Sequence, residues 1–183
     1  MSEQEATGQH ELLGDFRPGF TLWSRRYADF DVLVAQLEGG GLLGDDIASG
    51  LEVLKEAIFS SRNYVTLYDL TLVNFEATSL LPHAMQLISF ASEMRQQSEE
   101  KQRCMVAICT DERARNWIRW ILGLLPYSVN FHIFRDAAQA WAFVAAGCTD
   151  RQQHPGGGSY DSFGAEASLP QAVSGVSFDY GLR

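Results

Sequence analysis

The stretch YVTLYDLTLVNFEATSLLPHAM, residues 64–85, decides the fold of this chain. Its first residues, Tyr64 to Tyr68, form a β-branched and aromatic run that predicts a buried strand. Asp69 interrupts the apolar run, which then continues to Phe75. Beyond residue 77 the apolar residues recur at intervals of three and four as far as Met94, which predicts a helix. The stretch is therefore a strand, a short loop and a helix.

The predicted start of that helix contains polar residues. Thr78 or Ser79 is placed to cap the first turn by accepting a hydrogen bond from a backbone N–H group. Pro82 fits the same turn, because a residue there has no intrahelical partner for an N–H group. The amino end of this helix therefore offers unpaired backbone donors.

Shorter strand and helix patterns precede residues 64–85. Alternating side chains predict an edge strand at 20–24, and a second run at 31–37 predicts its hairpin partner, which ends before three glycines. Asp45 or Asp46 caps a predicted helix whose apolar stripe reaches Ile58.

Downstream, the patterns alternate again. The wholly apolar run 104–109 predicts a strand buried on both faces, which is typical of a parallel sheet. A helix capped by Thr110 and Asp111, a strand at 129–134 and a helix from Asp136 follow. This order predicts an α/β fold with a mixed, mainly parallel sheet of four to five strands and about four helices. We expect the strands at 64–68 and 104–109 to be adjacent and parallel at its centre.

Composition divides the chain into three parts. Residues 1–15 are polar and acidic and predict a flexible leader, residues 16–148 form the predicted domain, and residues 149–183 are a Gly- and Ser-rich tail. The tail contains too few apolar residues to fold alone, so we expect it to lie outside the domain core as a docking arm.

Charge and cysteine usage exclude several classes of protein. The formal net charge of −9 argues against nucleic-acid binding and against docking to anionic membranes. No apolar run approaches the roughly 18–20 residues that cross a bilayer, and residues 1–15 lack the apolar core of a signal peptide. The three cysteines lack zinc-site spacing, so we expect free thiols in a reducing cytoplasm and neither a metal nor a cofactor.

The segment DLTLVNFEATSLL, residues 69–81, resembles the central motif of STAS domains, the anti-sigma-factor-antagonist family, usually written DLSxVxFIDSSGL. DLT matches DLS, the valine and phenylalanine match the apolar pair, and TS matches the serine pair at the helix start. LVAQLEGG (33–40) and MVAICTDERARNWI (105–118) resemble the opening hairpin and a late strand–helix repeat of the same family. The resemblance spans about residues 18–146 and implies a STAS-like fold that acts by binding a protein.

The resemblance also implies where the partner binds. The predicted contact is the loop and helix start around Ser79, with Asp69, Glu76, Thr78, Ser79, Leu80 and His83. Ala77 and Leu80 stand where phosphorylated members of the family have an acid and a glycine, so we expect Ser79 to act mainly as a helix cap. Asp69, Ser79 and His83 do not predict catalysis, because no G-x-S-x-G turn accompanies them.

Aromatic residues provide a second candidate surface. Trp120 falls off the apolar stripe of its predicted helix, and the tail contains two aromatic pairs suited to a partner groove. These pairs are Tyr160 with Phe163 and Phe178 with Tyr180. The sequence thus predicts a non-catalytic protein-binding module with a regulatory or assembly role. The alternative is a small-molecule or lipid carrier with a pocket between sheet and helices.

Overall fold

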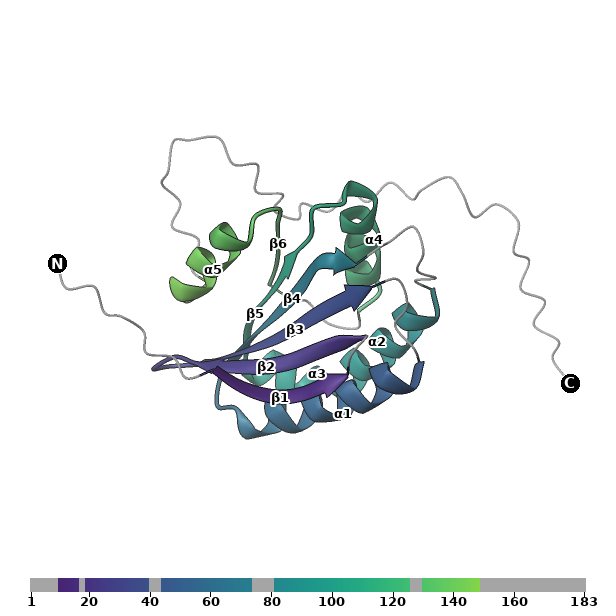
Figure 1. The fold of residues 1–183 in the computed structure, drawn as a ribbon. Helices are drawn as coiled ribbons and strands as arrows, with labels where there is room; N and C mark the ends of the chain where they lie inside the picture. Colours follow the sequence, from purple (N-terminus) through teal and green to yellow (C-terminus); the bar gives the residue numbers. More distant parts are fainter. Residues whose placement is uncertain (1–9, 17–18, 40–43, 74–80, 126–129, 149–183) are drawn as a thin grey trace, which may run out of the picture.

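The structure is a computed structural model, and it describes residues 10–16, 19–39, 44–73, 81–125 and 130–148. Six strands and five helices occur in these ranges (Figure 1). The strands are β1 (His10–Phe16), β2 (Phe20–Arg26), β3 (Asp31–Gly39), β4 (Tyr64–Val73), β5 (Gln102–Ile108) and β6 (Phe131–Phe134). The helices are α1 (Gly44–Ser60), α2 (Leu81–Glu93), α3 (Arg95–Lys101), α4 (Glu112–Gly123) and α5 (Ala137–Ala145).

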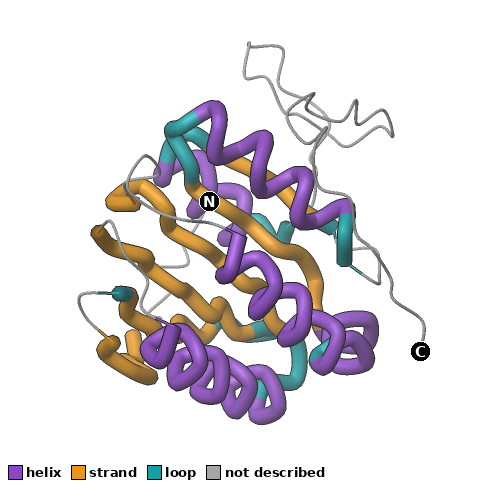
Figure 2. Tube along the Cα trace, turned by 90° about the vertical axis from the view of Figure 1, so that its right-hand side faces the viewer, coloured by secondary structure: helices purple, strands orange, loops and turns teal. Residues whose placement is uncertain are grey.

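The described strands lie side by side in one sheet (Figure 2), and their order is β1-β2-β3-β4-β5-β6 (Figure 1). β1, β2 and β3 pair in antiparallel fashion, and β3 to β6 are parallel. The prediction of a mixed, mainly parallel α/β sheet is confirmed, although the sheet has one strand more than the upper count. β4 and β5 are adjacent and parallel and neither is at an edge, as predicted.

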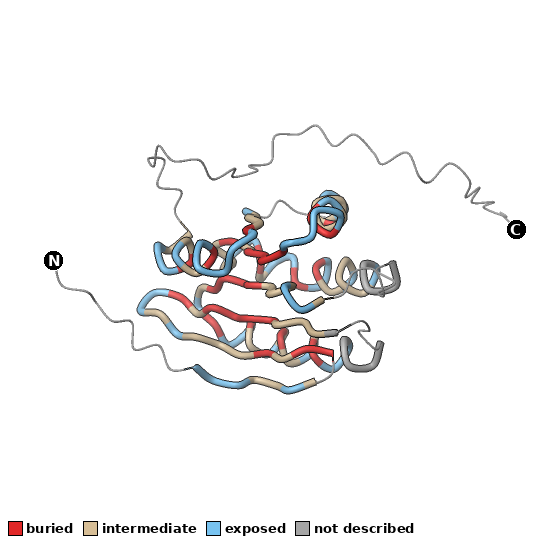
Figure 3. Tube along the Cα trace, turned by 45° about the horizontal axis from the view of Figure 1, so that its top comes forward, coloured by how far each residue is buried: buried red, intermediate tan, exposed pale blue. Residues whose placement is uncertain are grey.

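Helices cover both faces of the sheet, which explains why β4 is apolar on both sides. Tyr64, Val65 and Leu67 are each at most 1% exposed, and the central strands are the buried part of the molecule (Figure 3). The helices α1, α2 and α4 pack on one face, called here the cavity face. Among the described helices, α5 alone packs on the other face, called here the α5 face (Figure 1).

Two of the predicted helix caps are confirmed. Asp111 accepts a hydrogen bond from the backbone N–H of Ala114 at 2.7 Å, and Asp136 accepts one from the N–H of Gln139 at 2.9 Å. Each carboxylate satisfies a donor that the first helical turn leaves unpaired. These caps fix where α4 and α5 begin after the parallel strands β5 and β6.

The prediction of a flexible leader over residues 1–15 is wrong for its last part. Residues 10–16 form β1, which pairs with β2 and is the sheet edge, so the strand predicted at 20–24 is internal. Most side chains of β1 are exposed, and Leu12 is 65% exposed. An edge strand of this kind lacks the apolar run that marks a buried one, and therefore it resembles a leader in sequence. Residues 1–9 lie outside the described ranges.

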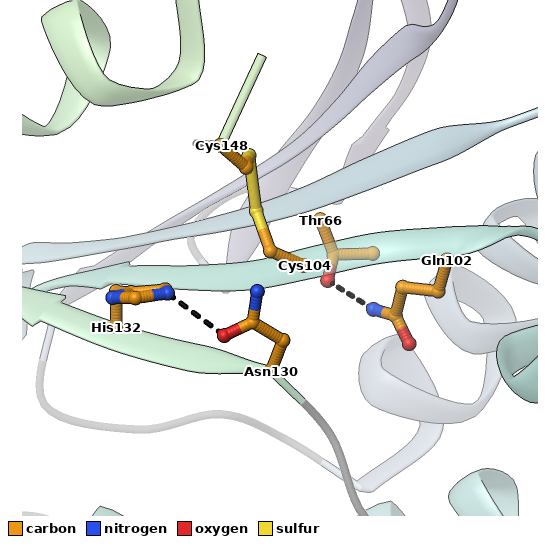
Figure 4. The surroundings of a disulfide bond; sticks show 6 residues. All are labelled: Thr66, Gln102, Cys104, Asn130, His132 and Cys148. Atoms are coloured by element: carbon orange, nitrogen blue, oxygen red, sulfur yellow. Dashed lines mark hydrogen bonds between the residues drawn. A yellow bond between two sulfur atoms is a disulfide. The ribbon is translucent and has the colours of Figure 1, made fainter. Parts of the chain in front are cut away.

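The prediction of free thiols is wrong for two of the three cysteines. Cys104 at the start of β5 is bonded to Cys148 just after α5, with Cα atoms 6.5 Å apart (Figure 4). Cys109 is free and buried. The two bonded cysteines are 44 residues apart in sequence, so only the packing of α5 on β5 brings them together.

Candidate functional site

An apolar cavity of about 210 Å³ lies on the cavity face, between the sheet and the helices. It extends along β4 from Tyr64 to Val73, and it also contacts β2, β3, β5 and β6. Helices α1, α2 and α4 form its opposite wall, with side chains such as Leu54, Phe90 and Ile121. These three helices therefore cover a cavity and do not pack fully against the sheet.

Small residues beneath these helices help to explain the cavity. Ala35 of β3 and Ala107 of β5 are 7% and 2% exposed, and each presents only a methyl group to the cavity. Gly50 of α1 contributes in a different way, by leaving room for an aromatic ring. A Cβ atom there would lie 1.7 Å from the Phe20 ring, so glycine lets that ring lie against the helix backbone. The ring and the glycine together form one end of the lining.

Four polar groups in the lining bind one another in two pairs. The Tyr64 hydroxyl and the Ser98 hydroxyl are 3.1 Å apart, and the Gln102 amide donates a hydrogen bond to Thr66 Oγ1 at 2.8 Å (Figure 4). All four are at the end where β4 and β5 begin. No Asp, Glu, Lys, Arg or His is among the described residues that line the cavity. A charged group inside it would therefore lack a partner.

The predicted partner loop is described only at its borders. Glu76, Thr78, Ser79 and Leu80 lie outside the described residues, and the side chain of His83 is not described. The proximity of Ser79, His83 and Asp69, and the cap at Ser79, therefore stay predictions.

Asp69 is inside β4 and not at its end, because the strand continues to Val73. Its carboxylate accepts hydrogen bonds from the backbone N–H of Thr71 at 3.0 Å and from the Thr71 hydroxyl at 2.7 Å. This agrees with the interpretation of Asp69 as an acid bonded to nearby backbone. Apolar side chains flank the predicted loop, since Leu72 is 55% exposed and Met85 is 62% exposed.

The second predicted surface differs from expectation. Trp120 is half-buried and not exposed, while Arg115 on the same helix is only 5% exposed. The Arg115 guanidinium donates to the carbonyl oxygens of Thr110 at 2.8 Å and Cys109 at 3.3 Å, so it ties α4 to the end of β5. Burial raises the pKa of the Cys109 thiol. These groups hold the β5–α4 turn together, and the role of Trp120 as a partner contact stays a prediction.

The described residues contain neither a metal-binding cluster nor a membrane-spanning helix. Across the described ranges, no group of three or more His, Cys, Asp or Glu side chains is arranged to hold a metal ion. No helix in those ranges is long and apolar enough to cross a membrane.

Comparison with known proteins identifies the architecture. No protein-family model matches the chain, and neither does any curated protein. Among solved structures, it is similar to an uncharacterized protein of the DUF3478 family from Shewanella loihica PV-4, which has a SpoIIAA-like fold. The TM-score is 0.50 and the identity 20%, over 68% of this chain and 93% of that one. This chain has a SpoIIAA-like fold.

The SpoIIAA-like fold is the STAS-like architecture that the motif at residues 69–81 resembles, so the recognition of that fold is confirmed. At 20% identity the likeness shows the fold alone, and the function must be argued from the residues of this chain. Sequence reasoning predicted the loop site but missed the residues of the cavity. A signal was present in the alanines at 35 and 107, because the residues at 33, 37 and 105, two positions away on the same strand face, are larger and apolar.

Proposed function

We propose that this chain is a non-catalytic binding domain that holds an elongated apolar small molecule, of the acyl-chain or lipid class, in the cavity. The cavity is the observation that carries the proposal. The lining includes both Tyr64 and Val73, which are nine residues apart on β4. At about 3.3 Å per residue that separation corresponds to roughly 30 Å, so the site can hold a long ligand.

The low polarity of the lining favours a ligand whose buried part is uncharged. The described lining contains no Asp, Glu, Lys, Arg or His side chain, and two pairs of its polar groups already bind each other. A charged headgroup would therefore remain at an opening of the cavity, while an acyl chain occupies the apolar part. Each methylene group transferred from water adds about 0.8 kcal/mol of binding free energy.

Native mass spectrometry of the full chain purified from its own cells tests this function. We expect an added mass that corresponds to an apolar molecule, and a clear loss of it in Ala107→Leu, which places a larger side chain in the cavity. Ala140→Leu is the matched control, because Ala140 is 0% exposed but lies in the core of the α5 face. An empty wild-type protein that also takes up no added fatty acid or alcohol would contradict the proposal.

A second candidate is the predicted protein-binding module, in which the loop around Ser79 contacts a regulator or a larger assembly. The exposed side chains of Leu72 and Met85, one on each side of that loop, favour it. Pull-down from the native cell with the double variant Leu72→Asp and Met85→Asp is the test. We expect the partner to be lost there and retained with Phe59→Asp, a change at another exposed apolar residue. Equal capture by both variants would refute this candidate.

The expected cytoplasmic location rested on free thiols, and the Cys104–Cys148 disulfide makes that expectation testable. Acid quenching of cells followed by alkylation reports the thiols as they are in vivo. Two alkylated cysteines at these positions would support a reducing compartment. An intact disulfide would contradict a cytoplasmic location.

A further inference from the structure

The α5 face carries an aromatic surface that the cavity does not use. The rings of Trp23 on β2 and Trp141 on α5 stack with centroids 5.7 Å apart. The Arg25 guanidinium lies 5.3 Å from the Tyr27 ring and 5.8 Å from the Trp141 ring. All four side chains are half-buried, and exposed Leu12 and His10 of β1 adjoin Trp23. We call Trp23, Arg25, Tyr27, Trp141 and Leu12 together the tryptophan surface.

The tryptophan surface contains a cationic side chain on an acidic protein. Arg25 is within it, and Arg103 lies 4.7 Å from the ring of Phe30 in the same apolar cluster. The whole chain has a formal net charge of −9. A guanidinium between aromatic rings suits a ligand that combines a carboxylate with apolar or aromatic groups.

The carboxyl-terminal segment leaves the domain beside this surface. After α5, the backbone N–H of Cys148 donates a hydrogen bond to the carbonyl oxygen of Phe143 at 3.1 Å. The N–H of Gly147 donates one to the carbonyl oxygen of Val144 at 2.9 Å. This is a Schellman turn, and both Gly147 and Cys148 have positive φ. The disulfide then fixes Cys148 on β5 (Figure 4). Gly147 lies near Arg103, since a Cβ atom built on this glycine would be 3.9 Å from the Arg103 guanidinium. Cys148, the last described residue, therefore lies on the α5 face.

The next 35 residues, 149–183, lie outside the described ranges and contain a segment with the required chemistry. Tyr160-Asp161-Ser162-Phe163 has a carboxylate between two aromatic residues. It follows Pro155 and three consecutive glycines, which allow the chain to reverse direction.

We propose that Tyr160–Phe163 docks in cis on the tryptophan surface, with Asp161 at Arg25 and the two rings against Trp23 and Trp141. The site is on the face of the sheet opposite the cavity, so the inference does not depend on the proposed function. The segment covers a surface that a partner would otherwise reach, and a partner that binds the tail must compete with this contact.

The length of the connection favours this segment over Phe178–Tyr180. Tyr160 follows Cys148 by twelve residues, which corresponds to a root-mean-square reach of about 20 Å for a glycine-rich chain. Trp141 is seven residues before Cys148, about 10 Å back along α5. Phe178 follows Cys148 by thirty residues, and its effective concentration at the surface is therefore about fourfold lower.

Fluorine NMR of the full chain labelled with 5-fluorotryptophan tests the proposal. The chain has four tryptophans, and Trp117 and Trp120 on α4 are internal controls because α4 packs on the other face of the sheet. Replacing Tyr160 and Phe163 with serine should shift the signals of Trp23 and Trp141 and leave the other two in place. Replacing Phe178 and Tyr180 with serine is the matched control and should leave all four unchanged.

The remaining outcomes overturn the proposal. No shift in the first variant means that the segment does not dock there, and an equal shift in the control variant means that the contact is not specific to it. A shift that disappears on dilution means docking between copies and not in cis. Asp161→Asn should lower the ratio of docked to free segment about two- to fivefold, as loss of one exposed ion pair does, while Glu166→Gln should not. An equal effect of both substitutions contradicts the pairing with Arg25.

Discussion

Replacement of Ala107 by leucine distinguishes a hollow domain from a fully packed one by the sign of its effect on stability. Ala107 is 2% exposed on β5, and its methyl group faces the cavity. Leucine adds three carbon atoms, which the volume of about 210 Å³ can accept. At about 0.8 kcal/mol per buried group, the free energy of unfolding should rise by roughly 2 kcal/mol. The corresponding rise in thermal midpoint is about 4 to 8 °C.

The assay is urea denaturation of the full chain after bound lipid has been removed on a hydrophobic resin. Ala140→Leu is the control, because Ala140 is 0% exposed and packs in the core of the α5 face. Extra groups in a closed core cost about 1–3 kcal/mol, so this variant should lose stability. If Ala107→Leu is destabilised to a similar extent, there is no space beside Ala107 and the cavity argument is refuted.

Three further predictions concern the rest of the domain. Asp111→Ala should lower the free energy of unfolding by about 1 kcal/mol because it removes a helix cap, and an unchanged urea midpoint would contradict that role. Cys148→Ser should lower the free energy of unfolding under oxidising conditions by up to about 4 kcal/mol, because the disulfide with Cys104 closes a loop of 44 residues. Under reducing conditions both proteins should unfold alike. A difference in stability that persists there would mean that the serine itself disturbs packing. Ser79→Ala should cost about 1 kcal/mol as a lost cap, whereas stoichiometric phosphate on Ser79 in protein from its own cell would restore the switch that the family resemblance implies.

Local patterns predicted the parts of the fold that depend on local physics. The apolar runs of β4 and β5 identify strands covered on both faces, and Asp111 and Asp136 identify helix starts because a cap acts within one turn. β1 was missed because an edge strand needs only backbone partners and leaves its side chains exposed.

The remaining features depend on contacts between distant segments. A cavity exists where side chains fail to fill a space, so it requires the positions of three helices relative to β4 and β5. The disulfide requires α5 to lie on β5, and no cysteine spacing predicts that. Arg115 has the spacing of a solvated residue, yet the carbonyl groups of Cys109 and Thr110 hold it inside.

The central claim is that the cavity binds an elongated apolar ligand, and a chain-length series tests it most directly. Binding of straight-chain alcohols to the delipidated full chain is measured by isothermal titration calorimetry, from hexanol upward. We expect Kd to fall about fourfold with each added methylene group, as about 0.8 kcal/mol per group requires, and then to level off once the cavity is full. Ala107→Leu should level off at a shorter chain. Affinity that does not depend on chain length, or that rises without limit in both proteins, would contradict a bounded cavity as the binding site.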